Sequence, residues 1–232
     1  MAQRMGKWDN SPVWIVSDID STLYTNPEYI RLCSIREVTE IARILGISTE
    51  KAEQKIMRMR KKLSLRIPRE ITLTETVYAL GLTEDEWGEL RCRAWEPEKW
   101  IKYDAELCAA LEEFRILPNV LGICFATNSP IEIGRRNLYA LGIPCESNLL
   151  FGPENLECSK PDARFFPRIA ASLGVSTTQC VSIGDRGMSD ADPAIVAGFC
   201  CAFIVEGRND FICTLRKLTR NIKRGKYHDD CV

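Results

Sequence analysis

Short apolar segments recur along the chain, and segments with helical character separate most of them. These apolar segments are too hydrophobic to keep one face in water, so they predict strands that are buried on both faces. Buried strands alternating with helices are typical of a parallel sheet covered by helices on both sides. The predicted fold is α/β, with three layers and a central parallel sheet of five strands. The candidate strands are Val13–Ser17, Val120–Ala126, Leu149–Phe151, Cys180–Ile183 and Cys200–Val205.

The first gap in this alternation is long and contains no convincing strand. Between Asn26 and Trp100 the sequence predicts four helices, three of which begin with a capping-box pattern, a Ser or Thr followed by Glu at the third position after it. We therefore expect a helical domain at residues 25–100, inserted into a core formed by residues 1–24 and 101–232. Such a module can act as a lid. The capping patterns are Ser34 with Glu37, Thr72 with Glu75 and Thr83 with Glu86, and the remaining helix extends from about Thr49 to Leu63.

Composition and charge exclude several classes of protein. Apolar residues make up 45% of the 232 residues, and 31 Lys and Arg nearly balance 32 Asp and Glu. Neither disorder nor a nucleic acid polymer as partner is therefore expected. The first residues lack the apolar core of a signal peptide, and no apolar run is long enough for a membrane helix. We expect a cytoplasmic protein without a membrane partner.

The cysteines and the single histidine make further kinds of site and mechanism unfavourable. The 11 cysteines are dispersed without a C-x-x-C pair, which favours buried, reduced thiols over a disulfide framework or a zinc site. The only histidine, His228, lies in a polar C-terminal tail. Its position removes most mechanisms that need a histidine base or a cluster of histidine ligands.

Two acidic residues, Asp18 and Asp20, follow the first apolar strand. Side chains two positions apart on an extended chain point to the same side, so both carboxylates can face one site. One carboxylate can then attack a phosphorus atom while the other transfers the proton, and the pair also attracts a divalent cation. A turn stabilised by an Asx hydrogen bond is the structural alternative.

A second polar segment, Thr127-Asn128-Ser129-Pro130, follows the strand Val120–Ala126. Ser129 with Glu132 forms a capping-box pattern, so Thr127 is expected just before a helix N-terminus. The free N–H groups there and the helix dipole favour an anion, to which a Thr hydroxyl adds a donor. A simple helix cap is the alternative function of this segment.

Two further segments supply a lysine and a group of acids. Lys160 precedes a predicted helix, where its point charge could hold a phosphoryl group, although most lysines are solvated surface residues. Asp185 ends a strand after a glycine and is a candidate Mg²⁺ ligand, and Asp190 could bind the ion or orient one of its waters. Asp192 precedes Pro193 and is interpreted as a helix cap. All these segments follow predicted strands, at the edge where ligands bind to open α/β sheets.

Together these segments resemble the haloacid dehalogenase-like (HAD) hydrolase superfamily. The resemblance implies a Rossmann-like core and, from the position of the insertion, an α-helical cap of the first type, C1. The segment Asp18–Tyr24 also looks like the start of the pyrimidine 5'-nucleotidase-like branch. The matching motifs are Asp18-Ile19-Asp20-Ser21-Thr22-Leu23, Thr127-Asn128, Lys160-Pro161-Asp162 and Gly184-Asp185 through Asp190.

The resemblance also implies a role for each residue of the site. Asp18 would be the nucleophile that forms an aspartyl-phosphate, and Asp20 would protonate the leaving oxygen and later activate water. The phosphoryl group would be bound by Thr127, Asn128 and Lys160. Mg²⁺ would be held by Asp18, the backbone carbonyl of Asp20 and Asp185, with Asp190 in support.

We therefore expect a Mg²⁺-dependent phosphatase that acts on a small phosphorylated metabolite. A phosphomutase or phosphotransferase using the same intermediate remains an alternative, as does a catalytically idle binding protein. A dehalogenase is disfavoured because Asp20 supplies an acid that displacement of a halide does not require. Four aromatic residues near or in the insertion are candidates for substrate contact or for the core: Tyr24, Trp87, Trp95 and Trp100.

Overall fold

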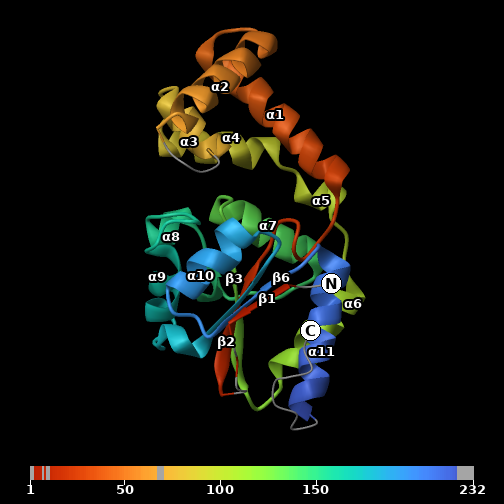
Figure 1. Cartoon of the computed structure of the whole chain (residues 1–232). Helices are drawn as coiled ribbons and strands as arrows, with labels where there is room; N and C mark the ends of the chain where they lie inside the picture. Colours follow the sequence, from red (N-terminus) through yellow and green to blue (C-terminus); the bar gives the residue numbers. More distant parts are fainter. Residues whose placement is uncertain (1–2, 7, 9–10, 67–70, 224–232) are drawn as a thin grey trace. The chain divides into compact units, whose positions relative to one another are not determined.

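The computed structural model describes residues 3–6, 8, 11–66 and 71–223 (Figure 1). His228 and the predicted polar tail lie outside these residues. The chain divides into two compact units, one formed by Met1–Asn26 with Pro97–Val232 and the other by Pro27–Glu96. No helix within the described ranges is both long and apolar enough to cross a membrane. Every cysteine in those ranges is a free thiol; Cys33, Cys124, Cys180 and Cys201 are buried, and Cys213 is exposed.

The first unit contains a sheet of six strands in the order β1-β6-β5-β2-β3-β4. All neighbouring strands are parallel except β1, which is antiparallel to β6. The α/β fold and the five predicted strands are therefore confirmed, within one residue at each end. The strands are β1 (Gln3–Gly6), β2 (Val13–Asp18), β3 (Val120–Ala126), β4 (Leu150–Phe151), β5 (Cys180–Gly184) and β6 (Cys201–Ile204).

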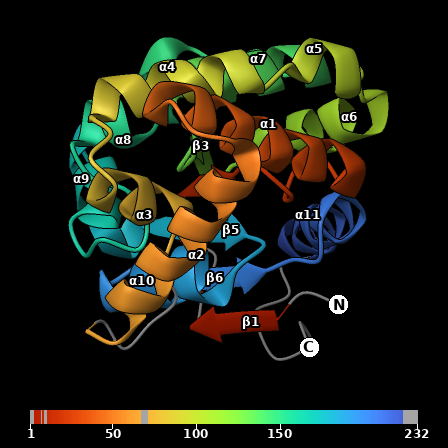
Figure 2. The ribbon, with the colours of Figure 1, turned by 90° about the horizontal axis from the view of Figure 1, so that it is seen from above.

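Strand β1 was not predicted from the sequence, and it makes the sheet six-stranded rather than five-stranded. It pairs along the outer side of β6, from Gln3 opposite Ile204 to Gly6 opposite Cys201 (Figure 2). An edge strand is held mainly by hydrogen bonds between main chains, which any non-proline residue can make. Its four residues therefore carry little of the apolar pattern that identifies a central strand.

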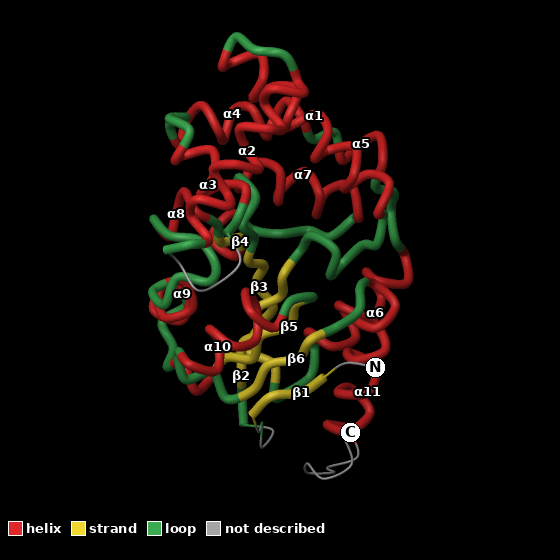
Figure 3. The backbone as a smooth tube through the Cα atoms, turned by 45° about the horizontal axis from the view of Figure 1, so that its top comes forward, coloured by secondary structure: helices red, strands yellow, loops and turns green. Residues whose placement is uncertain are grey.

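Helices cover both faces of this sheet, which gives the three predicted layers. Helices α8, α9 and α10 lie on one side, and α6 and α11 lie on the other (Figures 1 and 3). The core on the first side includes a group of aromatic rings, in which Phe166 makes edge-to-face contacts with Phe165 and Phe199. The bounds are α5 (Pro97–Trp100), α6 (Ala105–Arg115), α7 (Ile131–Leu141), α8 (Pro153–Leu156), α9 (Phe165–Ser172), α10 (Asp192–Val196) and α11 (Arg208–Lys223).

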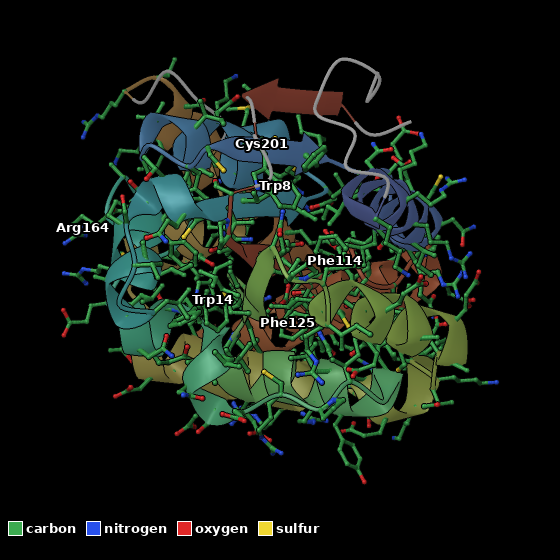
Figure 4. All side chains as sticks on the ribbon, turned by 90° about the horizontal axis from the view of Figure 1, so that it is seen from below. Trp8, Trp14, Phe114, Phe125, Arg164 and Cys201 are labelled. Carbon is green, nitrogen blue, oxygen red and sulfur yellow. The ribbon has the colours of Figure 1, made fainter. Side chains whose placement is uncertain are left out.

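A large aromatic side chain, Trp14, packs closely against a glycine of the neighbouring strand. Trp14 and Phe114 lie on opposite sides of the sheet (Figure 4). The indole of Trp14 lies against Gly122 of β3, where a Cβ atom would overlap the ring. The glycine therefore provides the room that the large ring needs beside the neighbouring strand.

The second unit is helical, with α1 (Pro27–Leu45), α2 (Thr49–Ser64), α3 (Leu73–Ala79) and α4 (Glu84–Ala94). The capping boxes at Thr72 and Thr83 form as predicted, with reciprocal bonds to Glu75 and Glu86. The apolar faces of the helices pack on one another to form a separate core. Its buried residues are Ile41, Ala42, Ala52, Ile56, Val77, Leu82, Trp87 and Leu90.

The predicted capping box at Ser34 and Glu37 is wrong. Helix α1 begins at Pro27, and proline is well suited to the first turn because its missing N–H is not needed there. Ser34 therefore lies inside the helix, and its hydroxyl donates to the carbonyl oxygen of Ile30. Glu37 does not cap the helix but is buried in the second unit.

The carboxylate of Glu37 joins helix α1 to the chain at the end of α4. Its Oε1 accepts hydrogen bonds from Arg91 Nε at 3.0 Å and from Trp95 Nε1 at 2.8 Å. The Arg91 guanidinium also lies 5.3 Å from the ring centre of Trp95. Loss of the buried Glu37 carboxylate is therefore costly, because Arg91 and Trp95 would both lose this acceptor.

We predict that Glu37→Ala destabilises the second unit by about 3 kcal/mol, because it leaves a buried guanidinium and an indole N–H without their acceptor. Hydrogen exchange of the amides in α1 and α4 would measure this loss for that unit alone. Glu40→Ala is the matched control, because Glu40 forms a more exposed pair with Arg43 and should cost less than about 1 kcal/mol. Equal effects of the two substitutions would contradict the prediction.

Candidate active site

The candidate site lies at the carboxyl edge of the parallel strands. Asp18 is the last residue of β2, Thr127 follows β3 directly, and Asp185 follows β5. Strand β2 lies between β3 and β5. The chain therefore continues from β2 to β3 on one side and later returns to form β5 on the opposite side of β2. Such a reversal opens a crevice at the carboxyl ends of the strands, and it places residues that are far apart in the sequence around one point.

Lys160 is the centre of this arrangement. Only 4% of the residue is exposed, and its Nζ lies 2.6 Å from Asp18 Oδ1 and 2.6 Å from Asp190 Oδ1. Both acids are also buried. A buried ammonium requires compensating charge, and two carboxylates supply it here. The lysine therefore ties the loop before α9 to the end of β2 and to the loop after β5.

The side chain of Asn128 holds the backbone of Lys160. Its Nδ2 donates to the carbonyl oxygen of Lys160, and its Oδ1 accepts from the Lys160 N–H, each at 2.8 Å. This reciprocal pair fixes the point from which the lysine side chain extends. The carboxamide of Asn128 is thus committed to Lys160, and the predicted phosphate contact of Asn128 stays a prediction.

Asp190 approaches the site because residue 184 is a glycine. A Cβ atom at Gly184 would overlap Cβ and Cγ of Asp190. The other carboxylate oxygen of Asp190 accepts from Arg186 N at 3.1 Å and from Ser189 Oγ at 3.0 Å. The π-helical turn Gly187–Ala191 therefore folds Asp190 back against the end of β5.

Three carboxylates form a group that could hold a metal ion. One oxygen from each of Asp18, Asp185 and Asp190 lies within 4.8 Å of the others. A set of carboxylate oxygens suits a hard cation such as Mg²⁺. Lys160 offsets only part of the charge of three acids, so the donor set and its net charge both fit a divalent cation.

The ionisation of these groups reflects the excess of negative charge. The pKa of Asp18 is raised to about 7, because burial, together with the charges of Asp190 and Asp185, outweighs the lowering effect of Lys160. Burial, followed by the charge of Asp190, also raises the pKa of Asp185. Burial lowers the pKa of Lys160, but Asp18 and Asp190 together outweigh it, so the net shift is upward and the ammonium stays charged.

Asp20 lies in a different environment from Asp18. Its carboxylate is not part of the three-acid group, and its predicted metal contact through the backbone carbonyl stays a prediction. The side chain accepts four hydrogen bonds, two on each oxygen. The donors are Tyr24 Oη and Asn137 Nδ2 at 2.8 Å to Oδ1, and Ser129 Oγ at 2.8 Å and Thr127 Oγ1 at 3.4 Å to Oδ2.

The predicted capping box at Ser129 and Glu132 is wrong. The hydroxyl of Ser129 donates to Asp20, and Glu132 pairs with Arg135 on the helix surface. Helix α7 begins after Pro130, and the N–H of Ile131 donates to Glu154 of α8. The tertiary structure thus provides an acid for the helix N-terminus and leaves the serine for the site.

Other residues around the site were not identified from the sequence. Thr22 Oγ1 donates to Asp18 Oδ2 at 2.8 Å. Asn137 is fully buried on α7, on the same face as Ile133 and Leu141. A single polar residue on an apolar helix face was the one signal that could have identified it.

The remaining candidates lie outside this network of contacts. Trp87 and Trp95 are buried in the second unit, and Trp100 is half-buried in α5 of the first unit. The side chain of Arg186 is 73% exposed, with its Nε 3.5 Å from Asp185. Asp192 is the first residue of α10 rather than its cap.

We predict that Gly184→Ala destabilises the protein by about 1–3 kcal/mol, because the added methyl group forces Asp190 away from Lys160. Thermal unfolding would measure the effect. Gly88→Ala is the matched control, because Gly88 lies inside α4 with no atom near its would-be Cβ. Alanine there should be neutral or stabilise by up to about 1 kcal/mol. A neutral Gly184→Ala would show that Asp190 is not held in this way.

Comparison with solved structures identifies the fold. A hydrolase from Pseudomonas syringae is 18% identical, with a TM-score of 0.55 over 89% of this chain and 99% of that chain. A haloacid dehalogenase-like family hydrolase from Xanthomonas campestris is 14% identical, with a TM-score of 0.53 over 93% and 95%. A HAD phosphatase from Thermococcus onnurineus is 22% identical, with a TM-score of 0.50 over 81% and 83%.

These similarities show a shared fold. Comparison with curated proteins gave no match. A sequence model of haloacid dehalogenase-like hydrolases matches residues 14–198. This match begins in β2, includes the helical unit and all the acids of the site, and ends after α10. The chain belongs to the haloacid dehalogenase-like hydrolase family.

Proposed function

We propose that the protein is a Mg²⁺-dependent phosphomonoesterase that acts through an aspartyl-phosphate on Asp18. The observation that carries this proposal is the different surroundings of the two acids at the end of β2. Asp18 contacts a buried lysine and belongs to the group of three carboxylates, whereas the donors to the Asp20 side chain among the described residues are neutral. The first arrangement suits a nucleophile for an anionic centre, and the second suits a group that exchanges protons.

In the first step, a carboxylate oxygen of Asp18 forms a bond to phosphorus as the bond to the leaving oxygen breaks. Thr22 and Lys160 each donate to one oxygen of Asp18, which fixes the orientation of the nucleophile. Asp20 gives its proton to the leaving oxygen. Lys160, Thr127 and Asn128 would bind the phosphoryl oxygens.

In the second step, water attacks the phosphorus atom of the aspartyl-phosphate. Asp20, now ionised, takes a proton from this water, the bond between Asp18 and phosphorus breaks, and inorganic phosphate is released. Asp20 is then protonated again and the nucleophile is restored. The two half-reactions therefore use Asp20 first as an acid and then as a base.

Mg²⁺ would be held by Asp18 and Asp185, with the backbone carbonyl of Asp20 and with Asp190 in support. When bound, it would reduce the repulsion between the attacking carboxylate and the anionic phosphate. The substrate would be a small phosphorylated metabolite such as a nucleotide or a sugar phosphate. We assign its selection to residues 25–100, which would form the C1 cap, and the catalytic core to residues 1–24 and 101–232.

We predict that the purified protein with Mg²⁺ releases inorganic phosphate from at least one member of a broad panel of phosphomonoesters, and that Asp18→Asn lowers this activity by more than about 10³-fold. Asp210→Asn is the control, because Asp210 lies on α11 and accepts from Glu206 N; it should retain full activity. Transfer of phosphate to an added sugar instead of water would indicate a mutase, and no turnover on any ester would contradict the enzyme assignment.

We also predict that Mg²⁺ binding at pH 6 releases about one proton. With a pKa of about 7, Asp18 is about 90% protonated at pH 6, and a cation can bind it only as that proton leaves. Metal affinity should therefore rise with pH up to about pH 7 and then level off. Calorimetric titration with MgCl₂ in two buffers of different ionisation enthalpy measures the protons released.

The same titration has two controls. At pH 8.5 the Asp18 carboxyl is already ionised, so proton release should be close to zero. Asp18→Asn should remove the release at pH 6 even if the variant still binds the ion through Asp185. Proton release that is equal at both pH values would contradict the assignment of Asp18 as the titrating ligand.

A further inference from the structure

The four groups that contact Asp20 share one chemical property. Three are hydroxyls, from Tyr24, Ser129 and Thr127, and the fourth is the carboxamide of Asn137. None of the four is a cation. Asp18, by contrast, contacts the ammonium of Lys160. The two acids at the end of β2 are thus held by different kinds of partner.

Each of these four groups can either donate or accept a hydrogen bond. An ammonium or guanidinium can only donate, so it would favour the ionised acid in both steps of the reaction. Hydroxyls and carboxamides can instead turn to suit a carboxylate or a carboxylic acid. Surroundings of this kind match a residue that must be protonated in one step and ionised in the next.

Asn137 is the carboxamide of this group, and it comes from a helix of the core. The residue is fully buried on α7, and Nδ2 donates to Asp20 Oδ1 at 2.8 Å. Its Oδ1 is buried and has no hydrogen-bond partner among the described residues. An unpaired buried acceptor is costly and requires an explanation. Asn137 therefore occupies this buried position at the cost of one unpaired oxygen, and the contact that offsets this cost is the hydrogen bond to Asp20.

We propose that Asn137 is a positioning residue that fixes the orientation of the Asp20 carboxyl group. Its Nδ2 holds Oδ1 of Asp20 from α7, so that Asp20 keeps one orientation in both steps of the reaction. This role rests on the proposed function, in which Asp20 alternates between acid and base. Asn137 itself does not touch the substrate.

The test compares two substrates that differ in their need for an acid. An alkyl phosphate such as glycerol phosphate needs a proton on its leaving oxygen, whereas p-nitrophenyl phosphate has a leaving group that is stable as an anion. Asn137→Leu keeps the size of the side chain and removes the hydrogen bond to Asp20. We expect kcat/KM to fall by about 10–100-fold for the alkyl phosphate and by less than about 3-fold for the aryl phosphate.

Two controls separate positioning from a loss of packing. Leu138→Ala removes a neighbouring buried side chain of α7 and should change both substrates by the same factor. In an Asp20→Asn background, Asn137→Leu should add no further selective loss, because residues that act as a unit are not additive. If Asn137→Leu does not fold, Asn137→Ser replaces it, since the shorter hydroxyl cannot reach Asp20 and should give the same selective loss.

An equal loss on the two substrates, or no loss on the alkyl phosphate, would overturn the role of Asn137 and leave the phosphatase proposal intact. A selective loss that persists in the Asp20→Asn background would also overturn it, because the effect would not pass through Asp20. If the wild-type protein hydrolyses neither these substrates nor any ester of the panel, the proposed function fails and this inference fails with it.

Discussion

The buried contact of Lys160 with Asp18 and Asp190 is the interaction on which the rest of the site depends. An ammonium that is removed from water is tolerated only where carboxylates lie close to it, and here both Nζ distances are 2.6 Å. Other features of the chain serve this contact. Asn128 fixes the backbone of the lysine, and Gly184 leaves room for Asp190. The excess of negative charge that remains around Asp18 is the physical reason why this site suits a cation.

The second constraint is the separation of tasks between Asp18 and Asp20. The two acids follow the same strand, but their side chains are held by groups from different elements. Asp18 is held by Lys160, and Asp20 is held in part by Asn137 of α7. The positive charge of Lys160 favours the ionised form of Asp18, whereas neutral groups that can donate or accept permit exchange of a proton at Asp20. The surroundings thus differ in the way that the proposed roles of the two acids require.

The sequence predicted an element correctly where the pattern for it lies within a few neighbouring residues. The five parallel strands and the capping boxes at Thr72 and Thr83 were predicted correctly, because buried strands and helix starts carry their pattern within a few residues. The same capping rule failed at Ser34 and Ser129. Ser34 lies inside a helix that begins earlier, and Ser129 contacts Asp20, which is 109 positions away in the sequence. Strand β1 was missed because main-chain pairing leaves little trace in the side chains.

The sequence by itself determined the α/β class, the helical insertion and the strand-end positions of Asp18 and Asp185. It could not determine which neighbours each acid has, because parallel strands join segments that are far apart in the chain. Lys160 lies 142 positions from Asp18, and Asn137 lies 117 positions from Asp20. Only the tertiary structure brings these groups within hydrogen-bond distance. The ionisation of Asp18 and the neutral surroundings of Asp20 are therefore properties of the fold, since both burial and the proximity of charges arise only when the sheet is assembled.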